Sequence, residues 1–423
     1  MLNQETLFAA AMQIQEPLYV KQVEFTKEIG ELHIYIDFRK GAKFKCPICG
    51  MADLPVHDTF EKTWRHLDFF QYKAFIHYRT PRSDCPEHGV HLVETPWGTP
   101  GSGFTLLFEA LVLQLAACMP VAQISLLMDE HDTLLWRIIG KHVNLAHAVA
   151  DYSDMHSVGI DETSSKKGHK YVTLFVDMDN SKVIHVAEGK DSATLTEFKA
   201  ELPGHQCNPT QITNISADMS PAFRKGAEMN FPWAAITFDK FHVIKLMNEA
   251  VDKVRREEQK TNPALKLSRY LWLFNPSKLN VEKTEKLETL KKSNIKTAKA
   301  YQLKLTLQDI YSTASDKIDA MIKLNKWYQW AVRCRLEPVI KFAKTIKNNW
   351  IGIINYFDSR LTNAVLEGIN SIVQAVRARA RGYRNVQNFI NMIYLLAGKL
   401  TFNFQYFIKR QKDYGQPSAV LPT

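Results

Sequence analysis

The sequence predicts a multidomain α/β protein, in which a mixed sheet is preceded by smaller modules and followed by a long all-helical segment. Three observations predict this class. Residues 156–260 alternate short apolar runs with amphipathic runs, and residues 261–350 are rich in Lys, Leu, Glu and Gln without a strand pattern. Residues 18–95 alternate apolar and polar residues around paired cysteines. The 423 residues are enough for two or three such domains.

The composition favours a globular protein with a polyanionic partner. Hydrophobic residues make up 45% of the chain and charged residues 23%, an ordinary balance for a packed core. The formal charge of +10 favours nucleic acid as the partner. No apolar run reaches the roughly 18 residues that cross a bilayer, so no membrane partner is expected. The N-terminus lacks the basic start and cleavage site of a secretory signal, which favours a cytoplasmic protein.

Two short motifs in the N-terminal region predict a zinc site. A Cys-x2-Cys pair and a Cys-x2-His pair, separated by 35 residues rich in strand signals, fit a tetrahedral site with two knuckles. The expected ligands are Cys46, Cys49, Cys85 and His88. His91 and His57 are substitutes for the fourth ligand, and three free cysteines are the alternative. We assign residues 1–100 to a zinc-ribbon-like module, in which the ion replaces part of a small core.

Residues 101–152 are predicted to form a helix-turn-helix. Two helical runs, 121–128 and 133–149, flank the polar break Asp-Glu-His-Asp and follow another helical run at 104–117. The lengths suit a DNA-binding motif, although an ordinary helical hairpin has a similar pattern. On the last helix, the side chains expected to face a DNA groove or phosphates are Arg137, Lys141 and His142.

The third region, residues 153–260, has the order of a ribonuclease-H-like fold. Strand patterns occupy 157–161, 170–178, 182–189, 211–218 and 234–239, and helical patterns occupy 192–202, 220–229 and 240–259. Short links between the first three strands predict antiparallel pairing, and the later helical crossovers predict parallel pairing. In this order the first and fourth strands are neighbours.

Acidic residues stand where these strands are expected to end. Asp161 ends the first strand, Asp218 the fourth and Asp239 the fifth. Because the first and fourth strands are neighbours, Asp161 and Asp218 should lie side by side. Two such carboxylates repel unless a divalent cation lies between them. Mg²⁺, or Mn²⁺, prefers oxygen ligands of this kind, and a two-metal pair would serve phosphoryl transfer.

A third acid is expected on a later amphipathic helix. Its apolar stripe consists of Leu361, Val365, Ile369, Ile372, Val373 and Val376. Glu367 lies beside that stripe and needs a partner, which a metal would provide. Asp239 competes for the third position, with His242 three residues later as a further accessory candidate. Glu162 reads as a neighbour of Asp161 rather than as a ligand.

Basic residues follow the candidate acid and enrich the helical segment. The arginines after Glu367 are expected to neutralise DNA phosphates, or else to form a solvated helix face; they are Arg377, Arg379, Arg381 and Arg384. The helices of 261–350 carry many lysines, which suits a DNA clamp, a dimer interface or a plain solvated surface equally. Residues 351–412 are assigned to the C-terminal part of the mixed-sheet domain, and 413–423 to a tail.

Four stretches resemble the DDE transposases of bacterial insertion sequences, closest to the ISL-three family. They are VGIDETSSKKGHKYVTLFVD, ISADMSPAF, ITFDKFHVIKLMNEAVDKVRR and LTNAVLEGINSIVQAVRARARGYRN, in the family's order. The resemblance implies Asp161, Asp218 and Glu367 as the catalytic triad of a ribonuclease-H-like domain with a helical insertion. It also implies an N-terminal zinc module, often with four cysteines, so that His88 is a departure.

The resemblance further implies the reaction and the partners. Both expected steps are in-line displacements at phosphorus, namely DNA cleavage at the inverted repeats of the element and strand transfer into target DNA. A homodimer that pairs the two ends and a bacterial, nucleoid-associated location are implied as well. The alternative is a sequence-specific DNA-binding regulator without cleavage activity. A ribonuclease-H-like nuclease of another kind would not need the two N-terminal DNA-reading modules, and the net charge argues against a small-substrate hydrolase.

Overall fold

The computed structural model describes residues 3–166, 170–276, 279–292, 295–359, 364–402 and 404. The chain separates into two compact units, one of residues 1–142 with 401–423 and the other of residues 143–400. The predicted tail, 413–423, and Leu361 of the predicted apolar stripe lie outside the described residues. Within the described ranges, no helix has both the length and the apolar character needed to cross a membrane.

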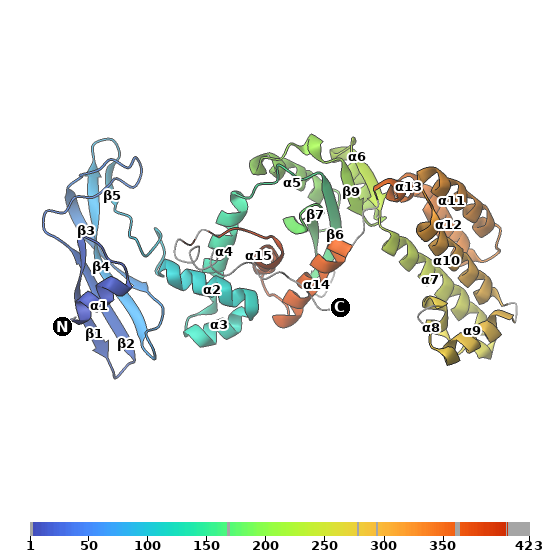
Figure 1. Ribbon diagram of the computed structural model, residues 1–423, viewed down its shortest axis with the longest axis horizontal. Helices are drawn as coiled ribbons and strands as arrows, with labels where there is room; N and C mark the ends of the chain where they lie inside the picture. Colours follow the sequence, from blue (N-terminus) through green and yellow to red (C-terminus); the bar gives the residue numbers. More distant parts are fainter. Residues whose placement is uncertain are drawn as a thin grey trace. The chain divides into compact units, whose positions relative to one another are not determined.

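A five-stranded sheet forms the first part of the first unit (Figure 1). Its order is β1-β2-β4-β3, with β5 paired to β4, and only β2 and β4 pair in parallel. Side chains alternate along β2 and β4, so that every second residue enters a core that also holds Phe8 and Trp64. The bounds are α1 Gln4–Ala11, β1 Leu18–Thr26, β2 Glu31–Phe38, β3 Val56–Arg65, β4 Lys73–Cys85 and β5 Gly89–Leu92.

Three helices follow this sheet, as predicted. They are α2 Leu106–Cys118, α3 Val121–Met128 and α4 Asp132–Ala148. The turn between α3 and α4 begins at Asp129, which has a left-handed backbone with φ of 48°, and the Ser125 hydroxyl donates to the Glu130 carbonyl at 2.6 Å. Buried Arg65 of β3 reaches Glu130 with its Nε at 3.3 Å, which holds the turn against the sheet.

The second unit is built on a five-stranded sheet of order β10-β9-β6-β7-β8. The predicted pairing is confirmed: β6, β7 and β8 are antiparallel, and β6, β9 and β10 are parallel. The bounds are β6 Ser157–Lys166, β7 Lys170–Asp177, β8 Lys182–Glu188, β9 Asn214–Ala217 and β10 Ala235–Phe238. The prediction that the first strand ends at Asp161 is wrong, because β6 continues its ladder with β7 beyond the point where β9 ends.

Helices cover both faces of this sheet. Val158 and Ile160 of β6 face the core formed with α5 and α6, whereas Gly159 between them faces Leu366 of α14. Because alternate residues of a strand point to opposite faces, α14 lies on the face opposite α5 and α6. On β8, the Val186 amide donates to the Tyr394 hydroxyl of α15 at 3.0 Å. The bounds are α5 Ala193–Glu201, α6 Pro221–Asn230, α14 Ala364–Arg379 and α15 Val386–Ala397.

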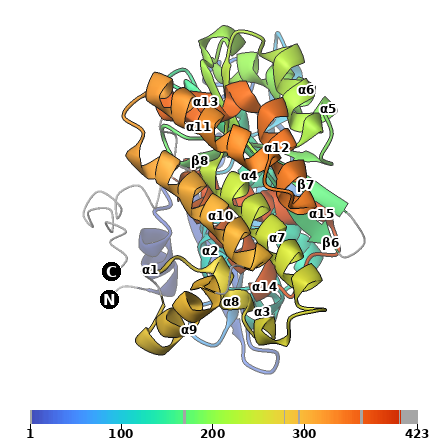
Figure 2. The same ribbon diagram turned by 90° about the vertical axis from the view of Figure 1, so that its right-hand side faces the viewer.

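Between β10 and α14 the chain forms a group of helices, and Figure 2 shows α7 and α10 side by side within it. One apolar core runs through these helices and includes Phe238 at the end of β10. The Asn355 amide of α13 donates to the Ile236 carbonyl at 2.9 Å, which attaches the group to the sheet. The bounds are α7 Lys240–Glu258, α8 Arg269–Leu273, α9 Val281–Lys292, α10 Lys296–Thr313, α11 Lys317–Val332, α12 Glu337–Asn348 and α13 Trp350–Ser359.

Candidate functional site

Three carboxylates lie side by side in the second sheet, on β6 and directly after β9 and β10. Gly159 of β6 pairs with Ser216 of β9, and continuing that register by two residues brings Asp161 opposite Asp218. Asp239 follows directly after β10, and its amide donates to the carbonyl of Ala217 at 3.4 Å. The sequence predicted this row, since carboxyl ends of parallel strands meet at one edge of a sheet.

The electrostatics of this edge suit a cation. Burial raises the pKa of Asp161, and the negative charge of nearby Asp218 raises it further, while a hydrogen bond from Asn370 opposes both. The pKa of His242 is raised by its hydrogen bond to Asp239 and by the charges of Asp239, Asp161 and Asp218. These groups therefore share one negative field, in which a divalent ion would relieve the repulsion.

Asp239 already has hydrogen-bond partners of its own. It is the N-cap of α7, with its two oxygens accepting from the amides of Phe241 at 3.0 Å and His242 at 3.3 Å. The Nδ1 of His242 lies 3.1 Å from the same carboxylate. Its side chain is buried, and these bonds explain its position without a metal.

Helix α14 lies along β6, and polar side chains on one face of the helix form hydrogen bonds with this strand. Asn370 donates to Oδ2 of Asp161, Gln374 donates to the Thr163 hydroxyl at 2.9 Å, and Arg377 donates to the Ser164 carbonyl at 2.8 Å. Glu367 precedes Asn370 by three residues, so it shares this face about one turn earlier. Its side chain is exposed. Glu162, in contrast, alternates to the other face of β6.

The close approach of α14 to β6 requires Gly159. A Cβ at this position would lie 2.8 Å from Cδ2 of Leu366 and 2.5 Å from Sδ of Met178. Leu366 belongs to the buried stripe of α14, which confirms the predicted amphipathic helix. Ile372, which was predicted to belong to this stripe, is exposed instead. A glycine two residues before Asp161 thus sets the distance between the two elements that carry Asp161 and Glu367.

The arginines after Glu367 surround an open pocket of about 660 Å³. It is lined by Arg377, Arg381 and Arg384, together with Gln374 and Tyr383. Arg379 is not among the lining residues. The helix ends here through Arg381 and Gly382, both with positive φ, which turns the arginines around the end of α14.

The four predicted zinc ligands lie together in the first unit. Potential ligand atoms of Cys46, Cys49, Cys85 and His88 are within 4.8 Å of one another. Sγ of Cys49 lies 3.8 Å from Sγ of Cys85, which in turn lies 3.6 Å from Nδ1 of His88. In a tetrahedral site with Zn–S bonds of about 2.3 Å and Zn–N bonds of about 2.0–2.1 Å, two sulfur ligands lie about 3.8 Å apart. A sulfur and a nitrogen ligand lie about 3.6 Å apart, so the observed distances fit zinc.

The substitutes for the fourth ligand are placed elsewhere. Nε2 of His91 lies 2.7 Å from the carbonyl of His88, and Nδ1 of His57 lies 3.4 Å from a carboxylate oxygen of Asp58. The group of four potential ligands that comes together contains His88 and neither of these residues.

Two of the predicted DNA contacts on α4 point inward. Nζ of Lys141 is 3.4 Å from Glu109 of α2, and Nε2 of His142 is 2.7 Å from the same carboxylate, whose side chain is 1% exposed. The expectation that Lys141 and His142 face a groove is therefore corrected: a buried carboxylate needs hydrogen-bond partners, and these residues supply them. Arg137 is exposed.

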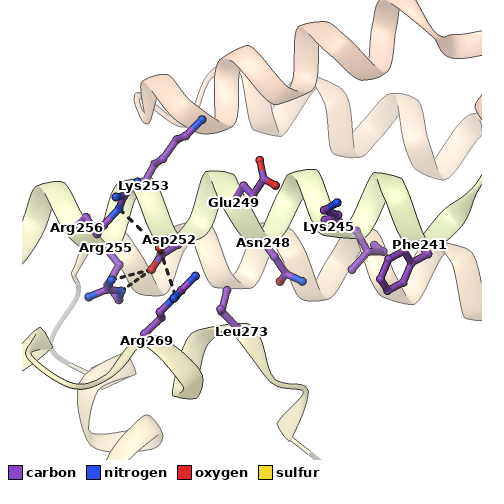
Figure 3. A pocket seen from close by; sticks show the side chains of 11 residues that line it. Phe241, Lys245, Asn248, Glu249, Asp252, Lys253, Arg255, Arg256, Arg269 and Leu273 are labelled. Carbon is purple, nitrogen blue, oxygen red and sulfur yellow. Dashed lines mark hydrogen bonds and ion pairs between the residues drawn. The ribbon is translucent and has the colours of Figure 1, made fainter. Parts of the chain in front are cut away.

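A second basic pocket, of about 590 Å³, lies along α7 and α8 (Figure 3). Asp252 lies between three guanidinium groups, with contacts of 2.7 Å to Arg255 and of 3.6 Å to Arg256 and to Arg269. Lys245 and Lys253 also line the pocket. Most basic residues of this pocket lie on α7, before the lysine-rich segment of residues 261–350, whereas Arg269 belongs to that segment.

Some features of the sites were missed in the sequence. Asn370 binds Asp161, and its spacing of three residues from Glu367 was the available signal. A second group of potential metal ligands, His147, Glu201 and His205, comes from segments with no motif. In the part of the chain that the structure describes, two groups have ligand atoms within 4.8 Å of one another, this one and the cysteine cluster; the three predicted catalytic acids are not such a group.

Comparisons with known proteins match these regions. Residues 158–393 match the profile of an ISL3 transposase family, and residues 93–143 match the helix-turn-helix domain of transposase family ISL3. Residues 42–88 match the zinc finger of the IS204/IS1001/IS1096/IS1165 transposases. The chain is similar to the Mycobacterium tuberculosis transposase for insertion sequence element IS1557, with 27% identity over 93% of this chain and 95% of that protein. It is also similar to the Bordetella parapertussis transposase for insertion sequence element IS1001, with 26% identity over 88% of this chain and 93% of that protein.

Proposed function

The chain belongs to the ISL3 family of transposases, and on that premise we propose that it cleaves and joins DNA at the inverted-repeat ends of an insertion sequence. The observation that carries this proposal is the meeting of β6, β9 and α14. The β6–β9 register aligns Asp161 with Asp218, and Asn370 of α14 binds Asp161 one turn after Glu367. This arrangement supports a ribonuclease-H-like catalytic domain with Asp161, Asp218 and Glu367 as its triad.

The triad would hold Mg²⁺ or Mn²⁺, because its donors are hard carboxylate oxygens in a negative field. When bound, such ions neutralise charge on the phosphate and favour an attacking oxygen at neutral pH. Asn370 positions Asp161 by fixing one of its oxygens. Asp239 holds the start of α7 and His242, which puts a proton donor near the acids. Asp239 and His242 are therefore proposed as supporting residues rather than as ligands.

The DNA-reading parts are proposed to divide the work. The zinc-ribbon-like module, 1–100, and the helix-turn-helix, 101–152, would recognise the element ends, with Arg137 exposed for contact. Residues 153–260 and 351–412 would form the catalytic domain, and residues 261–350 its helical insertion. A homodimer would pair the two ends. The cytoplasmic, nucleoid-associated location stays a prediction.

A regulator without cleavage activity is the alternative function. Its DNA-binding modules would be the same, so only the chemistry separates the two. The presence of all three acids, with Asn370 supporting Asp161, favours cleavage.

The experiment is cleavage of DNA carrying the element's own ends with Mg²⁺, comparing wild type with Glu367→Gln. We expect the wild type to cut and the variant to bind DNA with unchanged affinity but to lose cleavage by about 10³-fold, equivalent to roughly 4 kcal/mol. Equal cutting by the variant would remove Glu367 from the triad. If both proteins bind and neither cuts, the regulator becomes the better description.

A separate test concerns the arginines at the end of α14. Replacing Arg377 and Arg379 by alanine should weaken DNA binding and reduce the slope of log affinity against log salt by about 0.9 for each phosphate that is no longer neutralised. The matched control is Arg333→Ala, which removes an exposed charge from the end of α11. An unchanged slope in the double variant would take both arginines out of the interface.

A further inference from the structure

A cluster of histidines and a carboxylate lies in the second unit, apart from the carboxylate edge and the cysteines. His147 is in the last turn of α4, Glu201 ends α5, and His205 ends the following 3₁₀ turn, Leu202–His205. One potential ligand atom from each of the three residues lies within 4.8 Å of the others. Segments that are distant in the sequence thus bring their nitrogen and oxygen donors to one point.

The backbone fixes which nitrogen of each ring is available. Nε2 of His147 lies 2.9 Å from the carbonyl of Ile184, and Nδ1 of His205 lies 2.9 Å from the carbonyl of Ala150. A carbonyl only accepts, so these nitrogens carry the hydrogens, and in a neutral ring the other nitrogen keeps a lone pair. Histidines that bind metals are held in this way, with the second nitrogen donating to a carbonyl.

A further histidine, His185, contacts the carboxylate of Glu201. Nδ1 of His185 makes an ion pair with Oε2 of Glu201, and Nε2 of His185 lies 3.8 Å from Glu197. These three atoms are buried, and despite this burial the contact with His185 lowers the pKa of Glu201. The His185 side chain is 7% exposed. His185 therefore occupies Oε2 of Glu201, and the second carboxylate oxygen, Oε1, stays available to an ion.

We propose that His147, Glu201 and His205 bind a divalent transition ion such as Zn²⁺, with His185 orienting the carboxylate. Two imidazoles and one carboxylate suit zinc and leave a fourth position for water. They differ from the all-oxygen set of the catalytic edge, which suits Mg²⁺. Tetrahedral edges between such ligands are about 3.4 Å. Donor atoms that already lie within 4.8 Å of one another need only small side-chain movements to reach this spacing. The ion would fasten the last turn of α4 to α5.

A polar aromatic cluster without metal is the competing description. The ring of His147 lies 4.4 Å from that of Tyr394, and the ring of His205 stacks on Tyr152 at 4.6 Å between centroids. These contacts explain why the rings are packed. They do not require that a carboxylate oxygen and one ring nitrogen of each histidine lie within 4.8 Å of one another.

The test is cobalt titration of the full chain in an Asp161→Asn background, which weakens metal binding at the catalytic edge. Co²⁺ at the cysteine cluster gives a thiolate charge-transfer band, whereas Co²⁺ at the histidine cluster gives visible ligand-field bands without it. We expect both signals, and about two equivalents of zinc per chain after dialysis, one for each cluster. A single equivalent with only the thiolate signal would overturn the proposal.

Two variants assign the second signal. Glu201→Gln keeps the shape of a partly exposed side chain and should weaken cobalt binding at the thiolate-free site by about 10²-fold or more, since even loss of an outer-shell partner costs 10- to 100-fold. The matched control His156→Gln removes an exposed histidine of the same unit and should leave both signals intact. A thiolate-free signal that survives Glu201→Gln unchanged would place the ion elsewhere and contradict the assignment.

Discussion

The zinc cluster and the carboxylate edge assemble their proposed ligands in different ways. The zinc ligands come from two short turns, and β4 carries Cys85 to the turn of Cys46 and Cys49. The carboxylates depend on a sheet register for Asp161 and Asp218, and on a helix from 149 residues further along the chain, 367 minus 218, for Glu367. Local turns give a site that is complete in itself, whereas the carboxylate edge depends on how closely α14 lies against β6.

The largest expected effect is on DNA cleavage, and it should distinguish Asp218 from Asp239, the two acids that follow parallel strands. Asp218→Asn should reduce cleavage by about 10³-fold, because it removes a proposed metal ligand. Asp239→Asn should stay within about tenfold of wild type, since Asn is also a good N-cap for α7. Cleavage of element-end DNA measures both. Equal loss in the two variants would make Asp239 a ligand and would remove the distinction between the two acids.

The next effect tests whether the zinc cluster is independent of the carboxylate edge. Cys49→Ser should weaken zinc binding by at least about 10²-fold, because losing only a residue that supports a ligand already costs up to about that much. It should also unfold part of the module. End binding should fall, while Mg²⁺ affinity at the catalytic edge stays the same. Zinc content and calorimetry check these expectations. The control is Cys118→Ser, an exposed cysteine outside the cluster, and zinc loss in it would contradict the assignment.

A smaller effect tests the support that α14 gives to Asp161. Asn370→Ala removes a hydrogen bond to a carboxylate and should cost about 1.5–3 kcal/mol of transition-state stabilisation, or roughly 10- to 100-fold in cleavage. Gln374→Ala, on the same face of α14, removes only a bond to a hydroxyl and should cost less than tenfold. Initial rates at saturating Mg²⁺ measure the pair. If the two variants lose the same activity, Asn370 has no special role at Asp161.

The smallest effect on DNA cleavage is expected from a change in the packing of α14 against β6. Gly159→Ala should destabilise the second unit by about 1–3 kcal/mol, because its Cβ would collide with Leu366 and Met178. Thermal unfolding measures the loss. Adding Met178→Ala should restore part of it by giving space, whereas Leu174→Ala, in the neighbouring strand, should add its own loss. No change in stability for Gly159→Ala would mean that α14 is not held as closely as described.

The sequence predicted most of this fold, because the strands and helices of residues 156–260 follow simple periodicities. The grouping of the four potential zinc ligands was predictable from spacing alone, since four zinc-binding donors in two short motifs are typical of a structural metal site. Asn370 was missed because a polar residue on a helix gains a role only when the helix meets a strand. Lys141 and His142 were placed outward because the sequence does not show that Glu109 is buried beneath them.

By itself, the sequence determined the order of strands and helices, the zinc knuckles and, through a family resemblance, the candidate acids. Only the tertiary structure decided which side chains meet. Register and helix packing act between residues far apart in the chain, and no local pattern records them. They align Asp161 with Asp218, seat α14 on Gly159, and gather His147, Glu201 and His205, because burial of apolar faces fixes the backbones and leaves the polar side chains to pair where those backbones bring them.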